Sequence, residues 1–160
     1  MARDLDLAEL LKRFSLILLA TALLAIAGRA VGAQTVAVSG NPGLLRISAA
    51  VAGSQPTAVT NGSTTYTVTT PAPNRTYKVT AQLNVALPPG VTLTATFVAP
   101  PGATSNGPVA LGVTALDVVT GIPRNTNSTQ GITYQLSATV AAGVVTLSSR
   151  TVTLTIVRFP

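Results

Sequence analysis

The chain contains no cysteine, histidine or tryptophan among its 160 residues, and only 9% of its residues are charged. Without thiols and imidazoles it cannot form a disulfide, a Ser-His or Cys-His catalytic pair, or a zinc site built on those ligands. Nor does it contain a GxGxxG or GxxxxGK[ST] pattern, the usual glycine-rich loops for nucleotide phosphates. These absences exclude several common classes of hydrolase and nucleotide-binding protein.

Acidic side chains are scarce as well, and Asp117 is the only one after residue 33. A glycosidase needs two carboxyl groups that flank one bond, and a calcium site needs several. We therefore expect no enzyme activity, no cofactor and no metal ion. Two explanations for Asp117 remain open. It pairs with a basic residue across a strand or in a subunit contact, or it is a charge at a turn or strand edge that improves solubility.

The N-terminal segment has the features of an export signal. Three basic residues precede a largely apolar run at residues 14–27, and the small residues Val31 and Ala33 precede the bond to Gln34 in the pattern that signal peptidase recognises. The run is shorter than the roughly 20 residues that cross a bilayer, which favours a cleaved signal over an uncleaved membrane anchor. We predict a helical signal peptide at residues 1–33, cleavage between Ala33 and Gln34, and a secreted or cell-surface protein, with the periplasm as the alternative.

The rest of the chain is basic. It carries six basic residues against the single acid, a formal charge of +5: Arg46, Arg75, Lys78, Arg124, Arg150 and Arg158. Such an excess can attract nucleic acid or anionic lipid. The cations are scattered singly along the sequence, however, and no aromatic series lies between them for base stacking. We therefore expect no nucleic-acid partner, and contact with a membrane only during export.

Residues 74–102, NRTYKVTAQLNVALPPGVTLTATFVAPPG, show the pattern that dominates this part. Apolar and polar side chains alternate, stop at Pro-Pro-Gly and resume, which is typical of strands with one buried and one solvated face. Strands are predicted at 35–38, 44–51, 64–69, 76–87, 91–99, 109–115, 132–140 and 150–157. Turns or loops are predicted at 39–43, 60–63, 70–74, 88–90, 100–108 and 120–131, where Pro, Gly and Asn cluster. Residues 34–160 are thus expected to form one all-β domain, an antiparallel sandwich of about seven or eight strands without helices.

All three tyrosines lie in a recurring Thr-Tyr-x-apolar pattern, at 65–69, 76–81 and 133–138. One explanation is that tyrosine fits a half-buried pleated surface and so recurs in strands. The segment GITYQLSATV also resembles the strand of fibronectin type III and other immunoglobulin-like domains in which a tyrosine bonds back across a corner. The resemblance implies an immunoglobulin-like secreted bacterial sandwich, with Tyr134 as the corner tyrosine.

The solvated faces of the predicted strands carry mainly Thr, Ser, Asn and Gln. Long uncharged edge strands tend to recruit another strand unless charge or proline prevents it. The leading hypothesis is therefore a non-catalytic structural or adhesive module, a subunit of a pilus, filament or matrix that associates with itself or with other surface subunits by strand addition or edge pairing. The candidate donor strand is Gln34, Thr35, Val36, Ala37 and Val38, a segment that loosely resembles the N-terminal extension of donor-strand-complemented pilins.

Two other functions compete with this one. A carbohydrate- or ligand-binding module would act through the predicted long loops at 100–108 and 120–131, since binding residues concentrate on loops. An exported enzyme would have to use Asp117 without an acidic partner, and we do not expect it.

Overall fold

Most strands of the computed structural model, which describes residues 33–72 and 74–160, have alternating apolar and polar side chains. Apart from Ala33, the predicted signal peptide and its helix lie outside the described residues. The strands are β1 (Thr35–Ser39), β2 (Val59–Thr69), β3 (Thr76–Leu83), β4 (Val91–Phe97), β5 (Thr104–Ser105), β6 (Pro108–Ala110), β7 (Leu116–Ile122), β8 (Asn127–Ala138) and β9 (Val152–Phe159). A short 3-10 turn, η1 (Val140–Ala142), follows β8.

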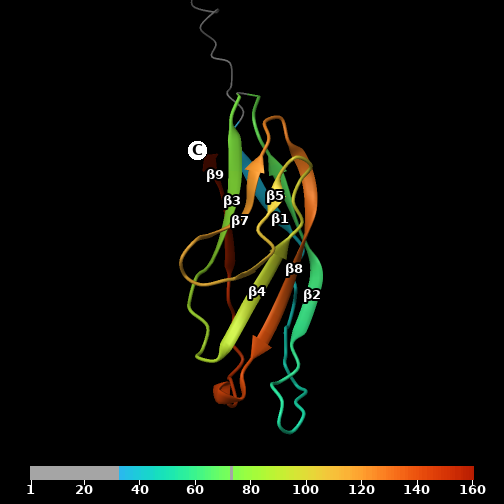
Figure 1. Cartoon of the computed structure of the whole chain (residues 1–160), viewed down its shortest axis with the longest axis vertical. Helices are drawn as coiled ribbons and strands as arrows, with labels where there is room; N and C mark the ends of the chain where they lie inside the picture. The colour runs from blue at the N-terminus through green and yellow to red at the C-terminus, as the bar shows by residue number, and fades with distance from the viewer. Residues whose placement is uncertain (1–32, 73) are drawn as a thin grey trace, which may run out of the picture. The chain divides into compact units, whose positions relative to one another are not determined.

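The strands form two antiparallel sheets that pack as a β-sandwich (Figure 1). One sheet has the order β1-β2-β8-β4-β6, and the other has the order β5-β7-β3-β9. Each strand pair is antiparallel. The predicted all-β antiparallel sandwich is therefore confirmed.

The core lies between the sheets and is built by the predicted period of two. In β3, Tyr77, Val79, Ala81 and Leu83 are buried, while the residues between them keep part of their surface exposed. The other sheet contributes the same pattern from β2, β4 and β8. The buried apolar residues are Tyr66, Val68, Tyr77, Val79, Ala81, Leu83, Leu93, Ala95, Phe97, Leu111, Val118, Val119, Ile122, Ile132 and Tyr134. This continuous apolar layer stabilises the fold by burial, without a disulfide, because the sequence has no cysteine.

The predicted strand at 44–51 is wrong, because residues 40–58 form neither strand nor helix. Leu44 and Val51 are exposed, and Gly43 and Gly53 adopt positive φ angles at either side of the segment. The sequence Ala-Ala-Val-Ala also lacks the polar residues that would place alternate side chains on a solvated face. Residues 40–58 therefore connect β1 to β2 without joining either sheet.

The predicted turn at 60–63 is also wrong, because these residues lie inside β2. The pairing of β2 with β8 shifts register between Asn61 and Thr64. The Asn61 side-chain oxygen accepts hydrogen bonds from the backbone N–H of Ser63, at 2.8 Å, and from its hydroxyl, at 2.7 Å. Asn-Gly-Ser thus forms a bulge within a strand instead of a reversal of the chain.

The predicted loop at 120–131 is wrong in most of its length, since β7 ends at Ile122 and β8 begins at Asn127. A tight turn at residues 123–126 connects them. Thr70 fixes this turn, because its hydroxyl donates to the Pro123 carbonyl and accepts the N–H of Thr126. Of the predicted strand at 109–115, only residues 109 and 110 lie in a strand, β6. The sequence pattern does not predict β7 as a strand.

The remaining differences are small. The two-residue strand β5 lies within the predicted loop at 100–108, and β3 ends before the expected boundary at residue 87. Helical structure in residues 33–72 and 74–160 is limited to η1. None of the helices in this described part is long and apolar enough to cross a membrane.

Candidate functional site

The candidate donor segment forms β1, at the edge of the five-stranded sheet. It pairs with β2 in an unbroken register that runs from Thr35 opposite Thr69 to Ser39 opposite Thr65. Gln34 precedes the strand and is exposed, as is Ala33. The segment therefore completes its own chain's sheet here, and its donation to another subunit stays a prediction, as does cleavage at the Ala33–Gln34 bond.

The interior of the sandwich is less well covered at one flank, where β1 and β9 are the outermost strands. Val36 and Val38 of β1 lie opposite the buried Val68 and Tyr66, so they face inward. Yet Val36 is only partly buried, and Val38 is 50% exposed. The side of β1 away from β2 therefore leaves apolar surface in contact with water.

Strand β9 shows the same incomplete burial. Leu154 and Ile156 pair with Ala81 and Val79 of β3, which are fully buried, but are themselves only partly buried. Within the described part of the chain, β3 is the only strand that pairs with β9. We call the inward-facing residues of these two edge strands the β1–β9 flank: Val36, Val38, Val152, Leu154 and Ile156.

The four sheet edges differ in how they are protected. Strand β5 has two residues, and β6 has three, one of them Pro108, so both offer few free hydrogen-bonding groups. Strand β9 has eight residues with Arg158 as its only charge, and β1 has five residues and no charge. Short length and proline thus protect two edges, while β1 and β9 have no further strand partner among residues 33–72 and 74–160.

Residues 40–58 connect β1 to β2 and contain no regular secondary structure. In Figure 1 this teal segment extends below the end of β2. Few hydrogen bonds hold it to the sandwich: the Ser63 hydroxyl donates to the Asn41 carbonyl at 3.2 Å, and the Val140 N–H donates to the Gln55 side chain at 2.8 Å. A long connection with few bonds allows β1 to leave its place at small cost in connection strain.

Gly40 is where the connection leaves β1. Its φ angle is +82°, and a Cβ atom added there would lie 2.7 Å from the Ser63 carbonyl oxygen. Both the backbone conformation and the close approach require glycine. The register of β1 on β2 therefore depends on this residue.

The sole acidic residue of the described chain, Asp117 on β7, pairs with Lys78 on the neighbouring strand β3. The Lys78 Nζ atom lies 2.9 Å from each carboxylate oxygen. Both side chains are partly exposed, and an ion pair in such a position contributes about 0–1 kcal/mol. Of the two explanations that the sequence left open, the cross-strand pair is the one that the structure supports.

The tyrosine hydroxyl that bonds to a distant part of the backbone is that of Tyr66. It donates to the Val98 carbonyl at 2.6 Å, and its ring packs edge-on against Phe97, with 5.4 Å between the ring centres. Tyr134 is buried in the middle of β8, not near its start. Burial raises the pKa of both hydroxyls, that of Tyr66 to about 12. The role of Tyr134 as a corner residue stays a prediction.

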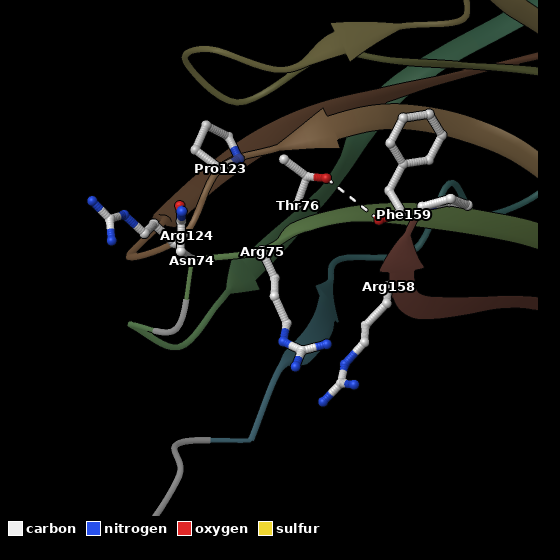
Figure 2. A pocket seen from close by; sticks show the side chains of 8 residues that line it. Asn74, Arg75, Thr76, Pro123, Arg124, Arg158 and Phe159 are labelled. Carbon is white, nitrogen blue, oxygen red and sulfur yellow. Dashed lines mark hydrogen bonds between the residues drawn. The ribbon is translucent and has the colours of Figure 1, made fainter.

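An open hollow of about 750 Å³ lies at one end of the sandwich (Figure 2). Three segments meet there: the β2–β3 connection, the β7–β8 turn and the end of β9. The lining residues are Asn74, Arg75, Thr76, Pro123, Arg124, Arg158, Phe159 and Pro160. Three of the six cations, which are scattered along the sequence, thus line one hollow, and sequence spacing could not show this. Only knowledge of the strand pairing, which places β9 and β7 on either side of β3, would have predicted this cluster.

The arginines have a defined arrangement. Arg158 pairs with Tyr77, and Arg75 stands two residues before Tyr77, so both point to the same side of the sheet. Figure 2 agrees, and it shows Arg124 extending away from them, beside Asn74. All three side chains are exposed, and none forms an ion pair with another described residue.

Acidic and metal-ligating groups do not gather anywhere in residues 33–72 and 74–160, where no cluster of three or more His, Cys, Asp or Glu side chains could hold a metal ion. Comparison with protein-family models, curated proteins and solved structures finds no match to this chain.

Proposed function

We propose that this protein is a secreted, non-catalytic structural module that assembles with copies of itself, or with other surface subunits, through the open edges of its sheets. The observation that carries the proposal is the β1–β9 flank, where two nearly uncharged edge strands leave inward-facing apolar side chains incompletely covered. A strand from another subunit would cover these side chains and pair with the free groups of β9.

The order of the strands supports an immunoglobulin-like relationship. The immunoglobulin arrangement has strands A, B, E and D in one sheet and C, F and G in the other. Strands β1, β2, β8 and β4 follow the first order, and β3 and β9 take the places of C and F. The place of G then corresponds to the open edge of β9, where an added strand would complete the arrangement. The tyrosine corner of immunoglobulin-like domains lies on strand F. Tyr134 lies on β8, the equivalent of E, so the strand correspondence does not depend on a tyrosine corner.

The N-terminal segment is the proposed donor. Val36 and Val38 alternate with Thr35 and Ala37, so the segment presents an apolar face to whichever sandwich it joins. It could add to β9 of a neighbour, or replace β1 of a neighbour on β2 in a reciprocal exchange. Because exchange remakes the same bonds between chains, its equilibrium depends mainly on protein concentration and on the connection at 40–58.

Two sets of variants test the proposal, with sizing chromatography and negative-stain microscopy of the exported protein as readouts. Ala37→Cys with Thr67→Cys joins β1 to its own β2, because these residues pair in register. The same protein under reducing conditions is its control, since the chain has no other cysteine. Thr153→Lys with Thr155→Lys places two charges on β9, and Thr133→Lys with Gln135→Lys places the same charges on the central strand β8.

The outcomes separate the routes. If both the crosslink and the β9 lysines prevent assembly, the N-terminal strand adds to β9. Loss through the crosslink alone indicates exchange onto β2, and loss through the β9 lysines alone indicates pairing of β9 edges. The proposal fails if the parent protein stays monomeric at high concentration, or if neither change alters its assembly while the β8 control behaves like the parent.

A further inference from the structure

The basic hollow at the end of the sandwich is a second candidate site, distinct from the pairing edge of β9 although Arg158 and Phe159 belong to that strand. We propose that it binds an acidic polysaccharide, a chain of sugars bearing carboxylate or sulfate groups. The guanidinium groups of Arg75, Arg124 and Arg158 would take the anionic groups. The exposed ring of Phe159, which extends to the opposite side of the strands from Arg75 and Arg158 (Figure 2), would lie against a sugar ring farther along the polymer.

The charge at this end of the sandwich favours an anionic ligand. No acidic side chain lines the hollow, and Asp117, the one acid of the described chain, is held by Lys78 on another part of the sheet. Arg75 and Arg158 lie on the same side of the sheet, and their like charges repel each other. An anion bound between them would relieve this repulsion.

The geometry favours a polymer over a small anion. Arg75 and Arg158 extend to one side, whereas Arg124 extends to the other (Figure 2), so the three groups do not converge on one point. A guanidinium binds one planar anionic group through two parallel hydrogen bonds. Anionic groups repeated along a chain match guanidinium groups that are spread around an open hollow.

The surrounding side chains favour sugars over nucleic acid. Asn74 lines the hollow beside Arg124, and Thr76 lines it on the side of Phe159 (Figure 2). An amide and a hydroxyl suit sugar hydroxyls as donors and acceptors. Proteins that bind single-stranded nucleic acid use several aromatic rings for successive bases. This hollow offers one, Phe159, which is 38% exposed.

The test measures binding of the purified protein to two matched pairs of polymers in buffer with about 0.15 M salt, where distant charges are screened. Polygalacturonate is compared with its fully methyl-esterified form, and dextran sulfate is compared with dextran. We expect binding to at least one charged polymer and none to its neutral counterpart. Equal binding to both members of a pair, or binding to neither charged polymer, overturns the proposal.

Matched variants test the site itself. Arg75→Gln with Arg158→Gln removes two charges from the hollow, while Arg46→Gln with Arg150→Gln removes two charges elsewhere. We expect the first pair to weaken binding about tenfold or more, and the second by less than about twofold because of screening. Circular dichroism and thermal unfolding test whether each variant is folded. If the Arg75/Arg158 variant does not fold, Arg124→Gln alone provides a milder variant of the hollow.

Three results would overturn the assignment. Equal loss of affinity in both variant pairs indicates diffuse electrostatic attraction without a site. Binding of a 20-nucleotide single-stranded DNA that is tighter than that of either charged polysaccharide, and that is lost in the Arg75/Arg158 pair, indicates nucleic acid instead. Unchanged affinity in a folded Arg75/Arg158 variant excludes the hollow as the binding site. None of these outcomes depends on strand exchange, since binding is measured on the monomer fraction.

Discussion

Tyr66 shows how one residue links the core to a connecting segment. Its ring lies in the apolar layer against Phe97, while its hydroxyl donates to the Val98 carbonyl just after β4. The sequence placed Tyr66 in a strand correctly, but the pattern Thr-Tyr-x-apolar is shared by Tyr77 and Tyr134. The backbone partner of a tyrosine hydroxyl depends on where other strands end. The alternation of side chains within one strand does not predict this.

Substituting Tyr66→Phe should lower the free energy of unfolding by about 1 kcal/mol, the usual net contribution of one hydrogen bond. The ring would keep its place, and the Val98 carbonyl would lose its donor. Urea titration measures the change. Tyr77→Phe is a matched control, because Tyr77 is as deeply buried and its hydroxyl has no bonding partner in residues 33–72 and 74–160. An equal loss in both variants would contradict the role given to the Tyr66 hydrogen bond.

The same hydroxyl predicts how stability depends on pH. Burial raises its pKa from 10.0 to about 12, so the unfolded chain loses this proton at a lower pH than the folded chain. Below about pH 10 both states hold the proton and its contribution is constant, and between about pH 10 and 12 stability falls. Tyr66→Phe should make that fall shallower in urea titrations at several pH values. A residual slope is expected from Tyr134, whose pKa burial also raises.

At the scale of elements, alternation located β1, β3, β4 and β9 to within a few residues but failed where strands are irregular. Strand β7 buries both Val118 and Val119, and its pairing with β3 shifts register beside them, so its sequence does not alternate. Asn-Gly-Ser inside β2 has the chemistry of a turn but forms a bulge. Local sequence specifies the preferred dihedral angles, and the partner strand decides whether the chain reverses there.

Gly40 controls the attachment of the proposed donor strand. Gly40→Ala should loosen β1 by about 1–3 kcal/mol, since alanine is strained at φ +82° and its Cβ would meet the Ser63 carbonyl. Faster hydrogen exchange at the amides of β1, with unchanged exchange in β3, is the expected result. Gly43→Ala is the control, because Gly43 also has a positive φ but has open space around its Cβ position. Slow exchange in β1 of both variants would show that Gly40 does not hold the strand.

At the scale of the whole molecule, sequence spacing and spatial position diverge most at the candidate sites. The open edges were expected from composition, because a lack of charge along a strand is visible in the sequence. The composition did not predict which edges are open, because that depends on the sheet order, which leaves β1 and β9 outermost. Likewise Arg75, Arg124 and Arg158 are far apart in the chain and line one hollow only because β9 and β7 both pair with β3. Non-local pairing creates both features.

The connection at 40–58 also sets whether β1 can pair within its own chain. Ser39 lies opposite Thr65, and β2 begins about six residues earlier, so the connection must cover about 20 Å. An extended chain covers at most about 3.5 Å per residue. Replacing residues 40–58 with four Gly and Ser residues should therefore prevent β1 from reaching its own β2 and force exchange between chains.

The expected result is a stable dimer or larger assembly on a sizing column at all concentrations where the parent is monomeric. A linker of about 12 Gly and Ser residues is the control, because it spans the distance and should leave the parent's behaviour unchanged. A short-linker protein that remains folded and monomeric, with slow hydrogen exchange in β1, would mean that β1 reaches its own β2 by another path. Exchange between subunits would then lose its geometric basis, and strand addition at β9 would remain as the route of assembly.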